Sequence, residues 1–122
     1  MKHSEAFVKL VDKVMPEIKE MTIDEVKAKL ESGADFHLVD VREDGEWSQG
    51  RIKGAIHIGR GVIERDIETI IENKDDLVVL YCGGGFRSAL AAHNIQFMGY
   101  SNVFSMSGGI RAWREVDYPQ ES

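Results

Sequence analysis

The chain has 122 residues, of which 43% are hydrophobic and 30% are charged. This length and composition fit one soluble globular domain that buries a core without disulfides or metal, and they exclude a disordered or membrane-spanning chain. With 21 acidic and 15 basic residues the net charge is −6, which argues against nucleic acid or an anionic membrane surface as the main partner.

The segment 1–20 is expected to be an amphipathic helical extension ahead of a domain over residues 21–122. Apolar side chains recur there at helical spacing and predict one helix that ends near Met15 and Pro16. The stripe consists of Phe7, Leu10, Val11 and Val14. It must be buried against its own domain or against a partner, which leaves a homodimer open. The segment has no apolar run typical of a secretory signal, and one cysteine cannot form an internal disulfide, so we expect a cytoplasmic protein.

The rest of the chain alternates between helices and strands. Thr22 and Glu25 have the spacing of a capping box, and Gly33 is placed to end the helix that they begin. The segment 42–54 is expected to be a loop with one helical turn. Strands are expected over 36–41, 55–58, 77–81 and 102–106, and helices over 65–74, 88–99 and 109–116. Because the strands are apolar rather than alternating, the pattern predicts an α/β fold, a central parallel sheet with helices on both faces.

The only cysteine, Cys82, follows the most strand-like run of the chain. In an open α/β sheet, ligands bind beyond the carboxyl ends of the strands. The glycines Gly83, Gly84 and Gly85 allow a loop to curl so that its N–H groups point at the sulfur, and they are expected to need dihedral angles that other residues resist. The helix starting near Arg87 and Ser88 adds its positive end. Together these features favour the thiolate and predict an activated nucleophile.

Other interpretations of this loop fit less well. A lone cysteine at the end of a strand is commonly a small buried hydrophobic residue without chemistry, but three glycines are then a poor choice for packing. A dinucleotide fingerprint needs a glycine where Ser88 stands, and the Gly-Lys-Ser/Thr of a phosphate-binding P-loop is absent.

Several charged or polar residues are weaker candidates for the site. Asp40 and Arg42 follow a strand at the predicted active edge, so they either support the loop or the bound anion or form an ordinary surface ion pair. Arg60, between two glycines, either brings a positive charge into the pocket or lies exposed. No histidine has a partner at metal-ligand spacing, so no metal site is expected. Ser105 and Ser107 lack the Gly-x-Ser-x-Gly pattern of a hydrolase.

Three segments carry a family resemblance. They are LVDVREDGEWSQGRIKGAIHI at 38–58, YCGGGFRS at 81–88 and SGGIRAW at 107–113. In this order they resemble the entry signature, the active-site loop and the closing motif of a single-domain rhodanese, a sulfurtransferase. Arg51 replaces a histidine often found in the first motif, Asp117 replaces a glycine often found before the final Tyr-Pro, and the loop carries no charged side chain at 83 and 84.

The resemblance implies a sheet of about five strands and a reaction at Cys82. The Cys82 thiolate would take a sulfane sulfur from a small anionic donor, such as thiosulfate or a persulfide, and pass it to a thiol or cyanide acceptor, without a cofactor. Gly83, Gly84, Gly85 and Phe86 would bind the donor, with Ser88 supporting them. Arg87 would neutralise its oxyanion and help to orient the loop. The acceptor could be a small thiol or a protein.

Two other functions remain open. A cysteine phosphatase also places a thiolate in a backbone cradle, but its loop has the form Cys-x5-Arg, whereas this loop is Cys-x4-Arg and is tighter. A non-catalytic rhodanese module would serve as a binding or regulatory surface, although such modules commonly lack the cysteine. Detection of a persulfide would distinguish these functions.

Overall fold

The computed structural model describes residues 2–122. Its helices are α1 (Glu5–Val14), the 3-10 turn η1 (Met15–Glu17), α2 (Ile23–Glu31), α3 (Asp44–Ser48), α4 (Ile63–Ile70), α5 (Phe86–Phe97) and α6 (Gly109–Glu115). Its strands are β1 (Lys19–Met21), β2 (His37–Asp40), β3 (Arg51–Ile52), β4 (Ile56–His57), β5 (Val78–Tyr81), β6 (Val103–Met106) and β7 (Gln120–Glu121). The predicted alternation of strands and helices is confirmed.

Five strands form one parallel sheet in the order β1-β6-β5-β2-β4. The predicted sheet and its strand number are therefore confirmed. Its edge strand β1 was not expected, because Lys19 and Glu20 are charged and exposed and only Met21 is buried. Strands β3 and β7 pair antiparallel in a separate two-stranded sheet, which was also not expected. Helix α4 ends at Ile70, four residues before the predicted end.

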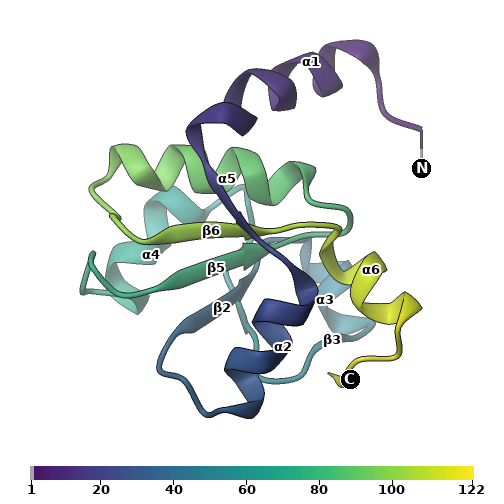
Figure 1. Cartoon of the computed structure of the whole chain (residues 1–122). Helices are drawn as coiled ribbons and strands as arrows, with labels where there is room; N and C mark the ends of the chain where they lie inside the picture. The colour runs from purple at the N-terminus through teal and green to yellow at the C-terminus, as the bar shows by residue number, and fades with distance from the viewer. Residues whose placement is uncertain (1) are drawn as a thin grey trace.

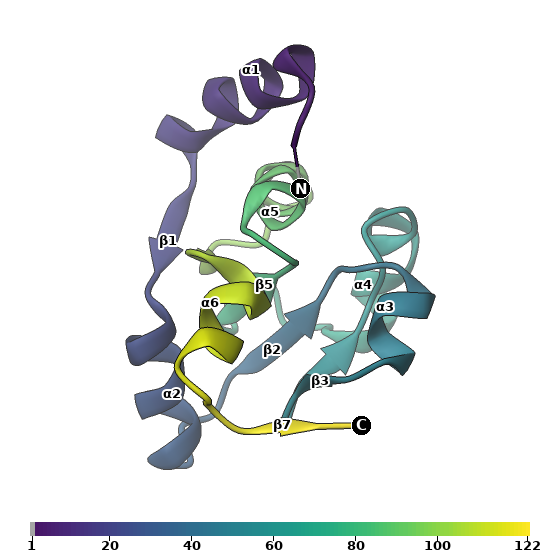
Figure 2. The same ribbon diagram turned by 90° about the vertical axis from the view of Figure 1, so that its right-hand side faces the viewer.

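Helices cover both faces of the sheet, with α4 and α5 on one face and α2 and α6 on the other (Figure 2). Residues of β5 alternate between the two sides. Val78 and Leu80 join the core cluster that includes residues of α4 and α5, while Val79 and Tyr81 join the cluster that includes residues of α2 and α6. Because both faces are buried, all four strand residues are apolar or aromatic, and the strand has no alternation of apolar and polar residues.

Helix α1 lies outside this arrangement, along the outer side of α5 (Figure 1). Val11 and Val14 pack with Ala89 and Leu90 of α5 in a third core cluster, and Phe7 lies against it. Within the predicted stripe, Val11 and Val14 are thus buried on the chain's own domain, Phe7 is partly buried, and Leu10 is 50% exposed. Strand β1 spans the expected boundary between the N-terminal extension, residues 1–20, and the domain, residues 21–122. That boundary stays a prediction. Within residues 2–122, no helix is both long and apolar enough to span a membrane.

Candidate functional site

The thiol of Cys82 lies at the carboxyl end of β5, where the chain turns into α5. The residue is 1% exposed. Its Sγ accepts hydrogen bonds from the backbone N–H of Gly85 at 3.1 Å and of Ser88 at 3.4 Å. The Ser88 hydroxyl lies 3.5 Å from the sulfur and 2.8 Å from the hydroxyl of Ser105. The sulfur thus lies among hydrogen-bond donors near the positive end of a twelve-residue helix.

The three glycines of the loop have different roles. Gly85 alone among them has a positive φ, +102°, directly before the helix, and a side chain would be strained there. The expectation that Gly84 needs such a dihedral angle is wrong. Within the described chain the backbone donors to sulfur are the amides of Gly85 and Ser88, so the predicted cradle is formed by two amides rather than by successive glycines. At Gly84, a Cβ would lie 3.4 Å from Nη1 of Arg111.

The first turn of α6 holds the loop in place. The N–H of Ile110 donates to the carbonyl of Cys82 at 2.9 Å, and the N–H of Arg111 donates to the carbonyl of Gly83 at 3.0 Å. This approach requires Gly109, where a Cβ would lie 2.5 Å from the Gly83 carbonyl oxygen and 2.6 Å from that of Cys82. The segment SGGIRAW therefore has a physical role, because its glycines let the helix start against the loop.

Arg87 is hydrogen-bonded to Glu46, a residue that was not singled out from the sequence. Its guanidinium donates to both carboxylate oxygens, at 2.7 and 3.1 Å. The hydrogen bonds from Arg87 lower the pKa of Glu46 from 4.5 to about 2, so the carboxylate is ionised at neutral pH and the pair persists. Glu46 also accepts a hydrogen bond from the N–H of Glu43 in the capping box of α3. Arg87 thus anchors the start of α5 to α3.

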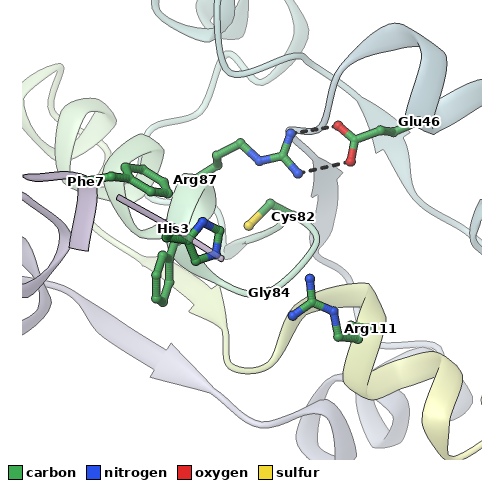
Figure 3. A pocket seen from close by; sticks show the side chains of 8 residues that line it. His3, Phe7, Glu46, Cys82, Gly84, Arg87 and Arg111 are labelled. Carbon is green, nitrogen blue, oxygen red and sulfur yellow. Dashed lines mark hydrogen bonds and ion pairs between the residues drawn. The ribbon is translucent and has the colours of Figure 1, made fainter. Parts of the chain in front are cut away.

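A pocket of about 370 Å³ opens at the sulfur (Figure 3). In Figure 3 the sulfur points into the cavity, with His3 and Phe7 on one side and Arg111 on the other. Eight residues line it: His3, Phe7, Glu46, Cys82, Gly84, Phe86, Arg87 and Arg111. A buried nucleophile at the floor of a pocket with two arginines is suited to attack on an anionic substrate.

Residues 22–116 match the Rhodanese-like domain family. This chain belongs to the rhodanese-like family. It is 36% identical over 104 residues to "Putative sulfurtransferase YtwF" of Bacillus subtilis (strain 168), with 85% of this chain and 98% of that protein covered. It is 31% identical over 102 residues to a "Sulfurtransferase" of Allochromatium vinosum, with 84% and 94% covered.

A solved structure from Rhodopseudomonas palustris CGA009 superposes with a TM-score of 0.88 at 32% identity, with 99% of this chain and 98% of that chain covered. It is described as "Protein of Unknown Function RPA3614, Possible Tyrosine Phosphatase". Helix α1 lies before the stretch matched by the rhodanese-like family and within the 99% covered by this structure. The fold resemblance therefore extends beyond the family domain.

The structure brings some of the predicted supporting residues to the rhodanese-like loop and not others. Ser88 contacts the sulfur. Asp40 and Arg42 form a buried ion pair instead, at 0% and 3% exposure, with 2.8 Å between Arg42 Nη2 and Asp40 Oδ2. Arg42 also donates to the carbonyl of Gly50 at 2.7 Å, so the pair links the turn after β2 to the segment between α3 and β3, and neither residue lines the pocket. Arg60 does not line the pocket.

Four residues that line the pocket at the sulfur were not expected there from the sequence: His3, Phe7, Glu46 and Arg111. Phe7 was assigned to a core-facing stripe, and Arg111 lay unremarked within the closing motif. Ser105 was considered as a hydrolase serine and dismissed, and it contacts Ser88 from β6. A local signal existed for Arg111, because its motif places it as the third residue of a helix that follows a strand at the active edge.

Proposed function

We propose that this protein is a sulfurtransferase that carries a sulfane sulfur on Cys82. The thiolate attacks the outer sulfur of a donor, a new S–S bond forms, and the rest of the donor leaves with the electron pair of the broken bond. An acceptor thiolate or cyanide then attacks the outer sulfur of the Cys82 persulfide and regenerates the thiolate. The reaction alternates between two enzyme forms, so ping-pong kinetics are expected.

One observation carries this proposal: the Cys82 sulfur is buried at the floor of a pocket and accepts hydrogen bonds from the N–H groups of Gly85 and Ser88. These donors would stabilise the negative charge of the thiolate and of the terminal persulfide sulfur. Membership of the rhodanese-like family and the sulfurtransferase names of relatives support the same chemistry. The acceptor would be a small thiol or a thiol of another protein.

Replacement of the nucleophile tests the proposal. We expect intact-mass spectrometry of the wild-type chain, after incubation with thiosulfate, inorganic polysulfide or an organic donor, to show a gain equal to one sulfur atom. Cys82→Ser should show no gain and no turnover, because a hydroxyl cannot carry the persulfide, while its far-ultraviolet spectrum and urea midpoint stay close to wild type. Turnover near the wild-type rate in Cys82→Ser, or no mass gain with any donor, would disprove the assignment.

The solved structure described as a "Possible Tyrosine Phosphatase" makes phosphatase activity a second candidate for a direct test. The loop is one residue shorter than Cys-x5-Arg, and Arg87 is held by Glu46, so a tetrahedral phosphoryl group finds a tighter and less cationic cradle. We expect no Cys82-dependent hydrolysis of p-nitrophenyl phosphate. A non-catalytic module would give neither a persulfide nor phosphate release.

A further inference from the structure

One side of the pocket is aromatic, and most of it comes from the N-terminal segment. The rings of His3, Phe7 and Phe86, here called the aromatic wall, form a mutual cluster. Ring centroids lie 4.6 Å apart for His3 and Phe86, 5.2 Å for His3 and Phe7, and 5.7 Å for Phe7 and Phe86. All three line the cavity at Cys82 (Figure 3). His3 and Phe7 precede the stretch that matches the rhodanese-like family, which begins at residue 22.

The aromatic wall is held in position by the packing of α1. Val11 and Val14 are buried against α5, whose first residue is Phe86. Ser4 caps α1 by accepting a hydrogen bond from the N–H of Phe7 at 3.2 Å, which fixes the direction in which the chain enters the helix. His3 is therefore brought over the pocket by a helix that is attached to the loop-bearing helix.

The opposite side of the pocket carries the guanidinium of Arg111. Arg111 forms no ion pair with any residue of the described range 2–122, whereas Arg87 is neutralised by Glu46. The Arg111 guanidinium lies over Gly84, with Nη1 3.4 Å from the position a Cβ would take there. Arg111 is thus the positive charge that remains available to a ligand beside the sulfur.

A small inorganic dianion would leave much of this site unused. The cavity of about 370 Å³ falls within the range of roughly 300–1,000 Å³ in which proteins bury organic ligands. Aromatic surface stabilises a bound apolar group and does nothing for a strongly hydrated ion. One unpaired arginine matches one negative charge better than two.

Resting on the function proposed above, we propose that the site takes an organic sulfane-sulfur donor in preference to inorganic thiosulfate. The apolar body of the donor lies on the aromatic wall, and its negative charge lies beside Arg111. The N-terminal segment, outside the family domain, is then a determinant of donor specificity.

The transfer step balances for a thiosulfonate, R–SO2–S⁻, which serves as the probe. The Cys82 thiolate forms a bond to the outer sulfur, and the bond between that sulfur and the sulfonyl sulfur breaks. The sulfinate R–SO2⁻ leaves with the electron pair, and the Cys82 persulfide retains one negative charge. An organic persulfide reacts in the same way and releases a thiolate. No oxidant, reductant or further reactant is consumed.

Three donors separate the effect of the donor's aromatic group from the effect of its charge. Single-turnover persulfide formation on the full chain is measured by intact mass with benzenethiosulfonate, methanethiosulfonate and thiosulfate. Both thiosulfonates carry one negative charge and release a sulfinate, so the ratio of their rates measures the effect of the aromatic group of the donor. Free cysteine gives the ratio set by intrinsic reactivity alone. We expect the ratio on the protein to exceed that on free cysteine by about five- to tenfold, the size of one aromatic contact. We expect thiosulfate to be slower than benzenethiosulfonate.

Variants assign the effect to the aromatic wall. Phe7→Ala and His3→Ala should each reduce the ratio toward that of free cysteine, and the rate with inorganic polysulfide, which has no organic body, is measured in parallel to report any change in the loop itself. Leu10→Ala is the matched control, because Leu10 lies on the same helix, is 50% exposed and does not line the pocket. A wild-type ratio equal to that of free cysteine, or a ratio unaffected in both wall variants, overturns the proposal while the sulfurtransferase assignment stands. Absence of any persulfide overturns both.

Arg111 is tested separately. Arg111→Gln should slow transfer from both thiosulfonates by roughly three- to tenfold, as expected for loss of one charge-assisted contact, and should reduce the dependence of the rate on ionic strength. Arg111→Lys should recover most of the rate. Equal rates in Arg111→Gln and wild type at low salt would show that Arg111 does not bind the donor.

Discussion

At the scale of single residues, the geometry assigns to two arginines the two roles that were expected of Arg87 from the sequence. Arg87 was expected both to orient the loop and to neutralise the donor. In the structure its guanidinium is occupied by Glu46, whose carboxylate it contacts at 2.7 and 3.1 Å. Arg111, in α6, lines the pocket and forms no ion pair with residues 2–122. Arg87 therefore fits the structural role, and the anion-binding role is the one proposed above for Arg111.

The ion pair predicts how stability depends on pH. Hydrogen bonds from Arg87 hold the pKa of Glu46 at about 2 in the folded protein, below its ordinary value of 4.5. Unfolding therefore takes up a proton between these values, and the stability that Glu46 contributes above about pH 4.5 is lost as the pH falls toward 2. Urea unfolding of wild type and Glu46→Gln at about pH 6 and about pH 3 should show a larger difference at the higher pH. An equal difference in unfolding free energy at both pH values would contradict the lowered pKa of Glu46 in the folded protein.

At the scale of secondary-structure elements, the start of α6 positions the catalytic loop. Gly109 has a φ of +60°, and a Cβ there would overlap the backbone of Gly83. We expect Gly109→Ala to lower the free energy of unfolding by about 1–3 kcal/mol and to slow persulfide formation, because the loop must move away. Gly61→Ala is the control, since nothing lies within 4 Å of its Cβ position and its φ is not positive. Urea unfolding and intact mass measure the two effects, and a loss in Gly61→Ala as large as that in Gly109→Ala would refute the steric explanation.

The end of α6 carries a departure from the family pattern that has a conformational consequence. Asp117 has a φ of +60°. Its N–H donates to the carbonyl of Arg114 at 3.1 Å, and the N–H of Tyr118 donates to that of Trp113 at 3.2 Å. These are the hydrogen bonds of a Schellman motif, in which glycine is the usual residue at this position.

Asp117→Gly should therefore stabilise the protein by roughly 0.5 kcal/mol, because relief of the left-handed conformation slightly outweighs the greater freedom of glycine in the unfolded chain. Asp117→Ala should be less stable than Asp117→Gly, since alanine lacks that conformational freedom. Urea midpoints of the three proteins check this order. If alanine proves as stable as glycine, backbone strain at residue 117 is not the cause.

At the scale of the whole molecule, α1 is an additional layer outside α5 that completes the pocket. Val11 is 2% exposed within that contact. We expect Val11→Ala to lower the free energy of unfolding by about 1–2 kcal/mol in a single transition with an unchanged urea m-value, because two buried methyl groups are lost and α1 unfolds with the domain. Leu10→Ala, at an exposed position, should cost less than about 0.5 kcal/mol. A separate early transition for α1 would show instead that the helix is only loosely attached.

The sequence alone was sufficient for the parallel α/β sheet, most of its helices and the Cys82 loop, because these depend on local hydrophobic patterns, turn residues and three ordered motifs. It was not sufficient for β1, whose charged residues pair at the sheet edge only because β6 is already in place. The contacts of Arg87 with Glu46, and of His3 and Phe7 with Phe86, join residues far apart in the chain. Such contacts are decided when whole layers pack, and local sequence carries no record of them. The position of Cys82 between a strand, a glycine loop and a helix could thus be predicted from its neighbours in sequence, whereas the surroundings proposed to select its substrate were decided by the tertiary structure.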